Sequence, residues 1–310
     1  MTVLVIGASG FLGKHLVAQM KNSGEAVIGT ERNSRTEDGL YSIDLGVKDE
    51  YLKINSLVEQ FKITKIINLA ASNVSPSDRM REENGQSSSF FENLYAVLST
   101  FRDVGLLHIG TSVEAKGEDF YFAAKYELRK LLENTNVKNQ IAILDLPKVV
   151  GPGEPLGRFT SNFMYSVIMN EEQEILHPCH KRNFMSAITV VDMITQTIKI
   201  WTSGGDEFPS HVSKTLSNYE VARLIIDCAS ETMRQVLVSH SPDIEVCDVC
   251  PADEAVLLVK PEFFSSKEFS YFLLEEKQSV EETLLQQFKN LSISPHKVIN
   301  HYRKETNRYE

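Results

Sequence analysis

The chain has 310 residues and a formal net charge of −10 at neutral pH, with 42% hydrophobic and 24% charged residues. This composition is typical of a globular protein with a sizeable core and excludes general disorder, and the length predicts one large domain or two modest ones. An acidic protein gains little from counter-ion release, so nucleic acid is excluded as an expected partner.

Nothing in the sequence indicates a membrane or an oxidising compartment. The start, MTVLVIGASG, lacks the basic region and long apolar stretch of a secretory signal, and no run of about 18 apolar residues would span a membrane. Cys179, Cys228, Cys247 and Cys250 are too few for a disulfide scaffold, so we expect a cytoplasmic protein. Cys247 and Cys250 have the spacing of half a zinc site, but no second pair follows and no metal is expected.

The first half of the chain alternates apolar runs of strand length with helical stretches. The run at 2–7 is continuous and β-branched, as in a strand buried on both faces. This alternation predicts an α/β fold, a doubly wound parallel sheet with right-handed crossovers and helices on both faces. Strands are predicted at 2–7, 26–30, 65–70, 106–112 and 141–146, and helices at 11–22, 49–61, 84–103 and 120–135.

The pattern changes after Leu146. GPGEPLG (151–157) holds three glycines and two prolines, which predicts a loop. We expect a smaller, interleaved C-terminal substrate domain at 151–185 and 216–295, with 186–215 returning to the first domain (1–150) and a tail at 296–310. A strand is predicted at 186–191, with helices near 159–170, 192–201, 217–234 and 278–290.

A glycine-rich turn, GASGFLG (7–13), joins the first strand to the first helix. Its glycines permit a tight turn, close approach of the backbone to a pyrophosphate and close packing of helix on strand. The helix N-terminus adds free N–H groups and the positive end of a dipole. A strand directly before and a helix directly after predict a Rossmann-type dinucleotide site at Gly7, Ser9, Gly10, Phe11, Leu12 and Gly13.

The end of the second strand bears on the choice of cofactor. GTERNSR (29–35) contains both a carboxylate, Glu31, and two arginines, Arg32 and Arg35. A carboxylate at this tip bonds the ribose hydroxyls of NAD, whereas arginine accommodates the 2′-phosphate of NADP. Two arginines with small polar residues between them favour NADP, with NAD as the alternative.

A Tyr-x-x-x-Lys pair follows the fourth long strand. Tyr121 and Lys125 are spaced to share one helix face, and Ser112 precedes them at the end of a strand. A fixed positive charge favours the phenolate of a tyrosine, and a serine hydroxyl can hold a carbonyl, so the three can move a proton during hydride transfer. The rival pair, Tyr126 and Lys130, lies about 140° around the helix and is interpreted as packing and a surface charge.

Together these motifs resemble the extended short-chain dehydrogenase/reductase family of sugar-nucleotide epimerases, dehydratases and ketoreductases, over about residues 2–290. YFAAKYELRKLLE (121–133) resembles the family's catalytic helix along its length. Asp44-Leu45 resembles the segment beside the adenine, Leu69-Ala70-Ala71 and Pro147 resemble positions next to the cofactor, and Asn84 resembles the family's helix asparagine. Other similar segments are Lys148-Val149-Val150-Gly151-Pro152, Arg158-Phe159 and Arg182-Asn183-Phe184, whose arginine typically holds a nucleotide diphosphate.

The resemblance implies an NAD(P)-dependent oxidoreductase acting on a nucleotide-linked sugar, most simply a 4-keto reductase. Tyr121 would protonate the new alkoxide, Lys125 would hold Tyr121 and the ribose, and Ser112 would bond the carbonyl. Lys148, Arg158 and Arg182 are the candidate substrate-binding cations. The resemblance also implies a homodimer built on the helices at 84–103 and 120–135.

Two alternatives remain open at the level of sequence. An epimerase uses the same core with a tightly held NAD, and a non-catalytic dinucleotide sensor or scaffold would have the fold without the chemistry. Lys148 and Val150 stand where the family usually has asparagine and tyrosine. Ser112 is followed by Val113-Glu114 rather than the Asp-Glu pair of the family's dehydratases, which argues against dehydration.

Overall fold

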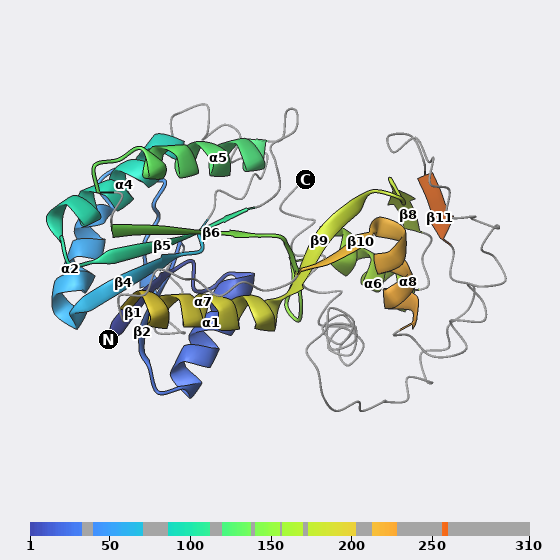
Figure 1. Ribbon diagram of the computed structural model, residues 1–310, viewed down its shortest axis with the longest axis horizontal. Coiled ribbons are helices and arrows are strands. Elements are labelled where there is room, and N and C mark those ends of the chain that lie inside the picture. The colour runs from blue at the N-terminus through green and yellow to red at the C-terminus, as the bar shows by residue number, and fades with distance from the viewer. Residues whose placement is uncertain are drawn as a thin grey trace. The chain divides into compact units, whose positions relative to one another are not determined.

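The structure is a computed structural model that describes residues 1–32, 40–70, 86–111, 120–137, 140–155, 157–169, 173–202, 213–227 and 256–259. The chain divides into two compact units (Figure 1). The first contains Met1–Pro147 and Val191–Ser210, and the second contains Lys148–Val190 and His211–Glu310. That the second unit binds the substrate stays a prediction.

A six-stranded sheet with the order β3-β2-β1-β4-β5-β6 forms the centre of the first unit. All neighbouring strands are parallel, and the order reverses between β1 and β4, which is where open parallel sheets bind their ligands. The strands are β1 (Thr2–Ile6), β2 (Ala26–Glu31), β3 (Tyr41–Ser42), β4 (Ile63–Asn68), β5 (Gly105–Thr111) and β6 (Ile141–Leu146).

Helices cover both faces of this sheet (Figure 1). On one face, α2 (Tyr51–Phe61), α4 (Gln86–Thr100) and α5 (Phe120–Glu133) bury a continuous apolar cluster against the strands. On the other face lie α1 (Phe11–Asn22) and α7 (Ala187–Thr202), which a 2.6 Å hydrogen bond from Gln19 to Asp192 joins. The predicted doubly wound α/β fold is confirmed.

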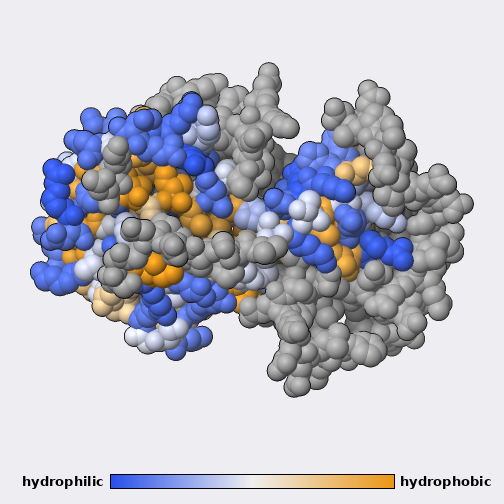
Figure 2. Space-filling model, viewed as in Figure 1, coloured by the Kyte–Doolittle hydropathy of each residue, from blue (hydrophilic) through white to orange (hydrophobic). Residues whose placement is uncertain are grey.

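Hydrophobic residues gather in the layer of the strands, whereas the outer faces of α4 and α5 are largely hydrophilic (Figure 2). Leu4, Ile66 and Leu106 occupy neighbouring strands on the α4–α5 face and are at most 1% exposed. Burial of this kind, at about 25 cal/mol per Å² of apolar surface, is the main stabilising contribution to the fold. Within the described part of the chain, no helix is long and apolar enough to cross a membrane.

The second unit is built around two small sheets. The first has the order β10-β9-β7, with β7 parallel and β10 antiparallel to β9, and the second pairs β8 with β11 in antiparallel fashion. The sequence patterns did not predict these strands or β3. All of them except the six-residue β9 have only two to four residues, too few to show a clear period. The elements are β7 (Lys148–Val150), α6 (Phe159–Met169), β8 (Gln173–Leu176), β9 (Lys181–Ser186), β10 (Lys214–Ser217), α8 (Asn218–Asp227) and β11 (Val256–Val259).

The prediction of a strand at 186–191 is wrong, because β9 ends at Ser186 and helix α7 begins at Ala187. Ser186 caps the helix, as its Oγ accepts the backbone N–H of Thr189 at 3.0 Å. Val190 and Ile194 are fully buried at helical spacing. The β-branched run at the start of α7 favours a strand locally, but the cap and the burial of one helix face override that preference.

Candidate active site

The turn between β1 and α1 leaves no room for side chains at two of its glycines. Gly7 has a left-handed φ of +85°, and a Cβ there would lie 3.0 Å from the backbone nitrogen of Ala70. A Cβ on Gly13 would lie 2.2 Å from the carbonyl oxygen of Gly7. The first glycine therefore permits the turn and the third permits the close packing of α1 on β1, as a phosphate-binding turn requires.

The N-terminus of α1 is open to a ligand. Gly10 is the N-cap residue and, as a glycine, has no side chain to cap the helix. Its N–H donates to the carbonyl of Gly7 at 3.0 Å. Ser9 and Gly10 are exposed, whereas Phe11 and Leu12 are half-buried. A twelve-residue helix that begins at such a turn offers backbone N–H groups and a positive dipole end, so the turn fits a dinucleotide pyrophosphate.

The ends of β2 and β3 lie beside this turn in the sheet order. Glu31 is the last residue of β2 and is 8% exposed, and its carbonyl accepts the N–H of Ile43 at 2.8 Å. Arg32 follows it and is exposed, and Arg35 lies outside the described residues. The acidic residue thus stands at the strand tip, where a ribose would be recognised.

The segment predicted to meet the adenine is held by α4. Asp44 accepts the N–H of Gly46 at 3.0 Å, and Leu45 is buried. Asn93 donates to the carbonyls of Leu45 and Val47 at 2.9 and 2.8 Å.

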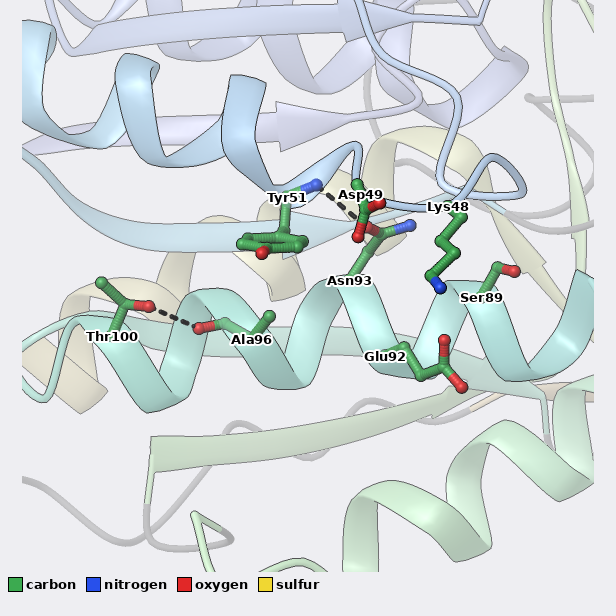
Figure 3. Close-up of a pocket in the computed structure, with 8 residues that line it drawn as sticks. All are labelled: Lys48, Asp49, Tyr51, Ser89, Glu92, Asn93, Ala96 and Thr100. Atoms are coloured by element: carbon green, nitrogen blue, oxygen red, sulfur yellow. Dashed lines mark hydrogen bonds between the residues drawn. The ribbon is translucent and has the colours of Figure 1, made fainter.

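The same Asn93 side chain accepts the N–H of Tyr51 at 2.9 Å, and Figure 3 shows it reaching from α4 toward that residue. A pocket of about 370 Å³ lies between α4 and residues 48–51, and no predicted site residue lines it (Figure 3). This pocket is therefore separate from the candidate site.

The end of β4 lies against the glycine turn. Leu69 donates its N–H to the carbonyl of Ile6 at 3.0 Å, and the N–H of Ala70 donates to the side-chain oxygen of Asn68 at 3.1 Å. The close approach of Ala70 to Gly7 brings the β1 and β4 ends together. The structure thus joins Leu69 and Ala70 to the glycine turn, as the sequence predicts, while Ala71 and Asn84 lie outside the described residues.

Helix α5 carries both tyrosine–lysine pairs, and their surroundings differ. Tyr126 is 52% exposed, and the amine of Lys130 lies 4.5 Å from the centre of its ring. Lys125 is half-buried, and its charge acts on the buried His108 of β5, so Lys125 is on the sheet side of α5. Position 121 is one turn before Lys125, but the side chain of Tyr121 and all of Ser112 lie outside the described residues.

The second unit gathers positive charge around one buried carboxylate. Burial, followed by the positive charges of Arg182 and Arg158, lowers the pKa of Lys148 to about 8, although the charge of Glu154 acts against them. Burial also lowers the pKa of Arg182. Glu154 accepts the hydroxyl of Thr160 at 2.6 Å and lies 3.7 Å from Arg158. The three predicted substrate-binding cations therefore lie in one unit and outnumber their carboxylate, which suits an anionic ligand.

Three residues near these sites were not predicted. Asn68 and His108 form a buried polar pair, and Glu154 is the carboxylate within the cation cluster. A histidine in the otherwise apolar run LLHIG was a visible signal for the pair, whereas Glu154 stands in a loop where only tertiary contacts reveal its burial. Pro147 is half-buried between β6 and β7, directly before Lys148.

Several remaining predictions concern metal binding, the cysteines and the C-terminal segment. Within the described residues, no group of three His, Cys, Asp or Glu side chains could hold a metal ion. Cys179 is half-buried. The other cysteines, the helix predicted at 278–290 and the tail at 296–310 lie outside the described residues.

The profile of the "NAD dependent epimerase/dehydratase family" matches residues 3–200, which span the glycine turn, α5 and the cation cluster. The chain belongs to the NAD-dependent epimerase/dehydratase family. It is thus an NAD-dependent oxidoreductase of the epimerase/dehydratase type, in agreement with the resemblance to extended short-chain dehydrogenases. The glycine turn and the strand ends around it are consistent with the dinucleotide that this family uses.

Solved structures of the family share the fold. A UDP-glucose 4-epimerase from Thermotoga maritima, solved with UDP-glucose, has a TM-score of 0.63 at 17% identity and covers 95% of this chain and 99% of its own. A dTDP-glucose 4,6-dehydratase from Bacillus anthracis, solved with NAD, has a TM-score of 0.58 at 13% identity and covers 74% of this chain and 80% of its own. L-threonine 3-dehydrogenase from Trypanosoma brucei also has a TM-score of 0.58 at 13% identity, and it covers 73% of this chain and 79% of its own. The fold therefore accommodates both nucleotide sugars and an amino acid.

The contact between Gly7 and Ala70 leads to a prediction for NAD binding. Gly7→Ala should weaken NAD binding at least about a hundredfold, because the new Cβ would push the β4 end away from the turn. The affinity can be measured by quenching of tyrosine fluorescence or by calorimetry.

Gly24→Ala is a matched control for this substitution. Gly24, just after α1, also has a positive φ, of +73°, but a Cβ added there would have no atom within 4 Å. That variant should lose stability and keep its affinity for NAD. Equal affinities of Gly7→Ala and wild type would contradict the assignment of the turn to the cofactor.

Proposed function

We propose that the protein is an NAD(P)-dependent oxidoreductase that acts on a nucleotide-linked sugar and reduces a 4-keto group. The observation that carries this proposal is the position of Lys125 on the sheet side of α5, where its charge acts on the buried His108 of β5, while Tyr126 and Lys130 face outward. Since residues i and i+4 of a helix share a face, this supports Tyr121 and Lys125 as the catalytic pair.

The roles of the proposed residues follow from their chemistry. A bound nicotinamide supplies or accepts the hydride. Tyr121 donates a proton to the alkoxide oxygen of the reduced sugar, Lys125 stabilises the resulting phenolate, and Ser112 donates a hydrogen bond to the carbonyl oxygen. The remaining residues of the cofactor site, from Gly7 to Gly13 with Asp44, Leu45, Leu69 and Ala70, bind the dinucleotide and orient it.

The cation cluster supports a nucleotide diphosphate as the recognised part of the substrate. Arg158 lies 3.7 Å from Glu154, and the charges of Arg182, Arg158 and Glu154 all act on Lys148, so the cluster has an excess of positive charge in a protein whose overall charge is −10. A diphosphate carries about two negative charges near neutral pH and accepts hydrogen bonds from guanidinium groups with favourable geometry. The L-threonine dehydrogenase among the similar structures acts on a substrate without a diphosphate, and this cluster favours a nucleotide sugar over such a substrate.

An epimerase is the second candidate, and it would be favoured if the cofactor is NAD. Glu31 stands at the tip of β2, which supports NAD, and an epimerase holds NAD tightly and regenerates it in each cycle. The preference for NADP over NAD rests on Arg32 and Arg35 and stays a prediction. We propose NAD as the working cofactor.

We also propose a homodimer formed through α4 and α5 and a cytoplasmic location. Tyr126 and Leu131 are large apolar side chains that remain 52% and 40% exposed on α5, which supports an interface on that helix. The location rests on the low cysteine content.

The catalytic assignment can be tested with Tyr121→Phe. This variant should lose at least about a hundredfold in kcat, both for reduction of a nucleotide-linked 4-keto sugar with NADH and for epimerisation of UDP-glucose, and keep its NAD affinity, because it lacks only the proton donor. Tyr126→Phe is the matched control from the same helix and should retain wild-type kcat. Equal turnover by Tyr121→Phe and wild type would show that the assignment is wrong, and NAD binding without turnover in either would favour a sensor.

The lowered pKa of Lys148 predicts a pH-dependent affinity for nucleotide diphosphates. The ammonium is present below pH 8 and lost above it, so the Kd for UDP should rise as pH increases through about 8. Measured between about pH 6.5 and 9, the change should approach tenfold. Lys148→Arg should abolish the change, since arginine keeps its proton. A pH-independent Kd in the wild type would contradict the participation of Lys148.

Glu31 gives a test of cofactor choice. Glu31→Ser should strengthen binding of NADP relative to NAD by about tenfold, because a carboxylate at the β2 tip repels the 2′-phosphate. Arg32→Ala should weaken NADP binding and leave NAD binding unchanged. Tighter binding of NADPH than of NADH by the wild type would overturn our choice of NAD and confirm the prediction made from the sequence.

A further inference from the structure

A polar pair lies within the apolar face of the central sheet that α5 covers. Asn68 of β4 and His108 of β5 face each other in register and are 0% and 1% exposed. The side-chain nitrogen of Asn68 lies 3.1 Å from Nδ1 of His108. The two buried side chains contact each other on a mostly apolar face of the sheet, where a polar group is costly unless it is hydrogen-bonded.

The contacts of Asn68 determine which nitrogen of His108 carries the proton. The side-chain oxygen of Asn68 accepts the N–H of Ala70 at 3.1 Å, so the amide nitrogen of Asn68 faces His108 and donates. Nδ1 of His108 must therefore be the acceptor, and the proton resides on Nε2. Nε2 is buried and has no hydrogen-bond partner among the described residues, which leaves Nδ1 as the nitrogen with a structural partner.

The imidazole remains in this neutral form at physiological pH. Burial, followed by the positive charges of Lys125 and Arg129 on α5, lowers the pKa of His108 to about 3. The charges around it also include Asp145 on β6, which forms an ion pair with Arg129. A protonated His108 would present N–H groups on both nitrogens, and Asn68 would then have to turn its oxygen toward the ring.

Such a turn of the Asn68 amide would affect the glycine turn. The Ala70 N–H would then face an NH₂ group instead of an oxygen and lose its acceptor. The nitrogen of Ala70 is also the atom that packs directly against Gly7, where a Cβ would lie 3.0 Å away. The position of the β4 end against the phosphate-binding turn thus depends on the orientation of one buried amide.

We propose that His108 and Asn68 are positioning residues for the dinucleotide: Nδ1 of His108 sets the orientation of the Asn68 amide, and that amide holds the N–H of Ala70 against Gly7. This inference rests on the proposed placement of the cofactor at the glycine turn. It assigns the function to the acceptor atom Nδ1, so an uncharged side chain with an acceptor at the same place should suffice.

Two substitutions of His108 separate these atoms. His108→Leu removes the acceptor, so Asn68 is free to turn, and the Kd for NAD should rise about tenfold while kcat at saturating NAD stays near the wild-type value. His108→Asn places a side-chain oxygen close to the position of Nδ1 and should keep the Kd within roughly twofold of wild type. Kd is measured by fluorescence quenching without substrate, and thermal unfolding confirms that each variant is folded.

Asn68→Asp provides an independent readout if His108→Leu does not fold. The carboxylate still accepts the Ala70 N–H but cannot donate to Nδ1, so NAD affinity should persist while the proton of His108 moves to Nδ1. Nitrogen NMR of labelled histidine should show Nε2 protonated in the wild type with no titration from about pH 5 to 9, and Nδ1 protonated in the variant.

The outcomes distinguish this inference from the function on which it rests. Wild-type NAD affinity in folded His108→Leu, or a proton on Nδ1 in the wild-type protein, would overturn the positioning role alone. Failure of the wild type to bind NAD, or unchanged binding by Gly7→Ala, would overturn the placement of the cofactor and the inference with it. Loss of affinity in both His108→Leu and His108→Asn would show a packing role for the ring instead.

Discussion

The structure of the first unit depends on one steric constraint, the direct contact of backbone with backbone at the turn between β1 and α1. The Gly13 backbone lies against the carbonyl of Gly7, and the Gly7 backbone lies against the nitrogen of Ala70. Because both positions are glycine and have no Cβ, α1 can pack close to the sheet, and its first N–H groups lie at the turn. The ends of β1 and β4 meet at the same point, where the strand order reverses. The proposed cofactor site is therefore a consequence of how closely three backbone segments approach one another.

The two proposed sites attract anionic ligands through different kinds of groups. The cofactor turn uses backbone N–H groups and a helix dipole, with a carboxylate at the neighbouring strand tip, and it has no cation cluster among its described residues. The site in the second unit uses lysine and arginine side chains around Glu154. A net charge of −10 would repel an anionic substrate at long range, so a concentrated local positive charge is needed to bind it. Partial burial of Lys148 and Arg182 strengthens their interactions by reducing solvent screening, and it is also why the proton of Lys148 is held less tightly than usual.

Two buried asparagines hold backbone segments of this fold in a particular orientation. Asn93 satisfies three backbone groups of the segment between β3 and α2, which keeps Asp44 and Leu45 in place beside the sheet. Asn68 performs a similar function at the end of β4, with His108 as its partner. In both cases an apolar residue could fill the space, but it could not supply the hydrogen bonds that orient the backbone.

The sequence by itself determined the parallel α/β sheet, the glycine turn and the order of the main elements, because periodicity and glycine spacing are local properties of the chain. Through the resemblance to family motifs it also indicated candidate charged site residues, namely Lys125, Lys148, Arg158 and Arg182, whose roles stay predictions. It placed a strand at 186–191, because β-branched residues outweigh a serine cap in any local pattern, and it did not reveal β3, β7 or β8. Only the tertiary structure decided that Lys125 faces the sheet, that Glu154 is buried among cations and that Asn68 meets His108 from 40 residues away. These facts depend on contacts between segments remote in the chain, and such contacts exist only once the sheet has formed.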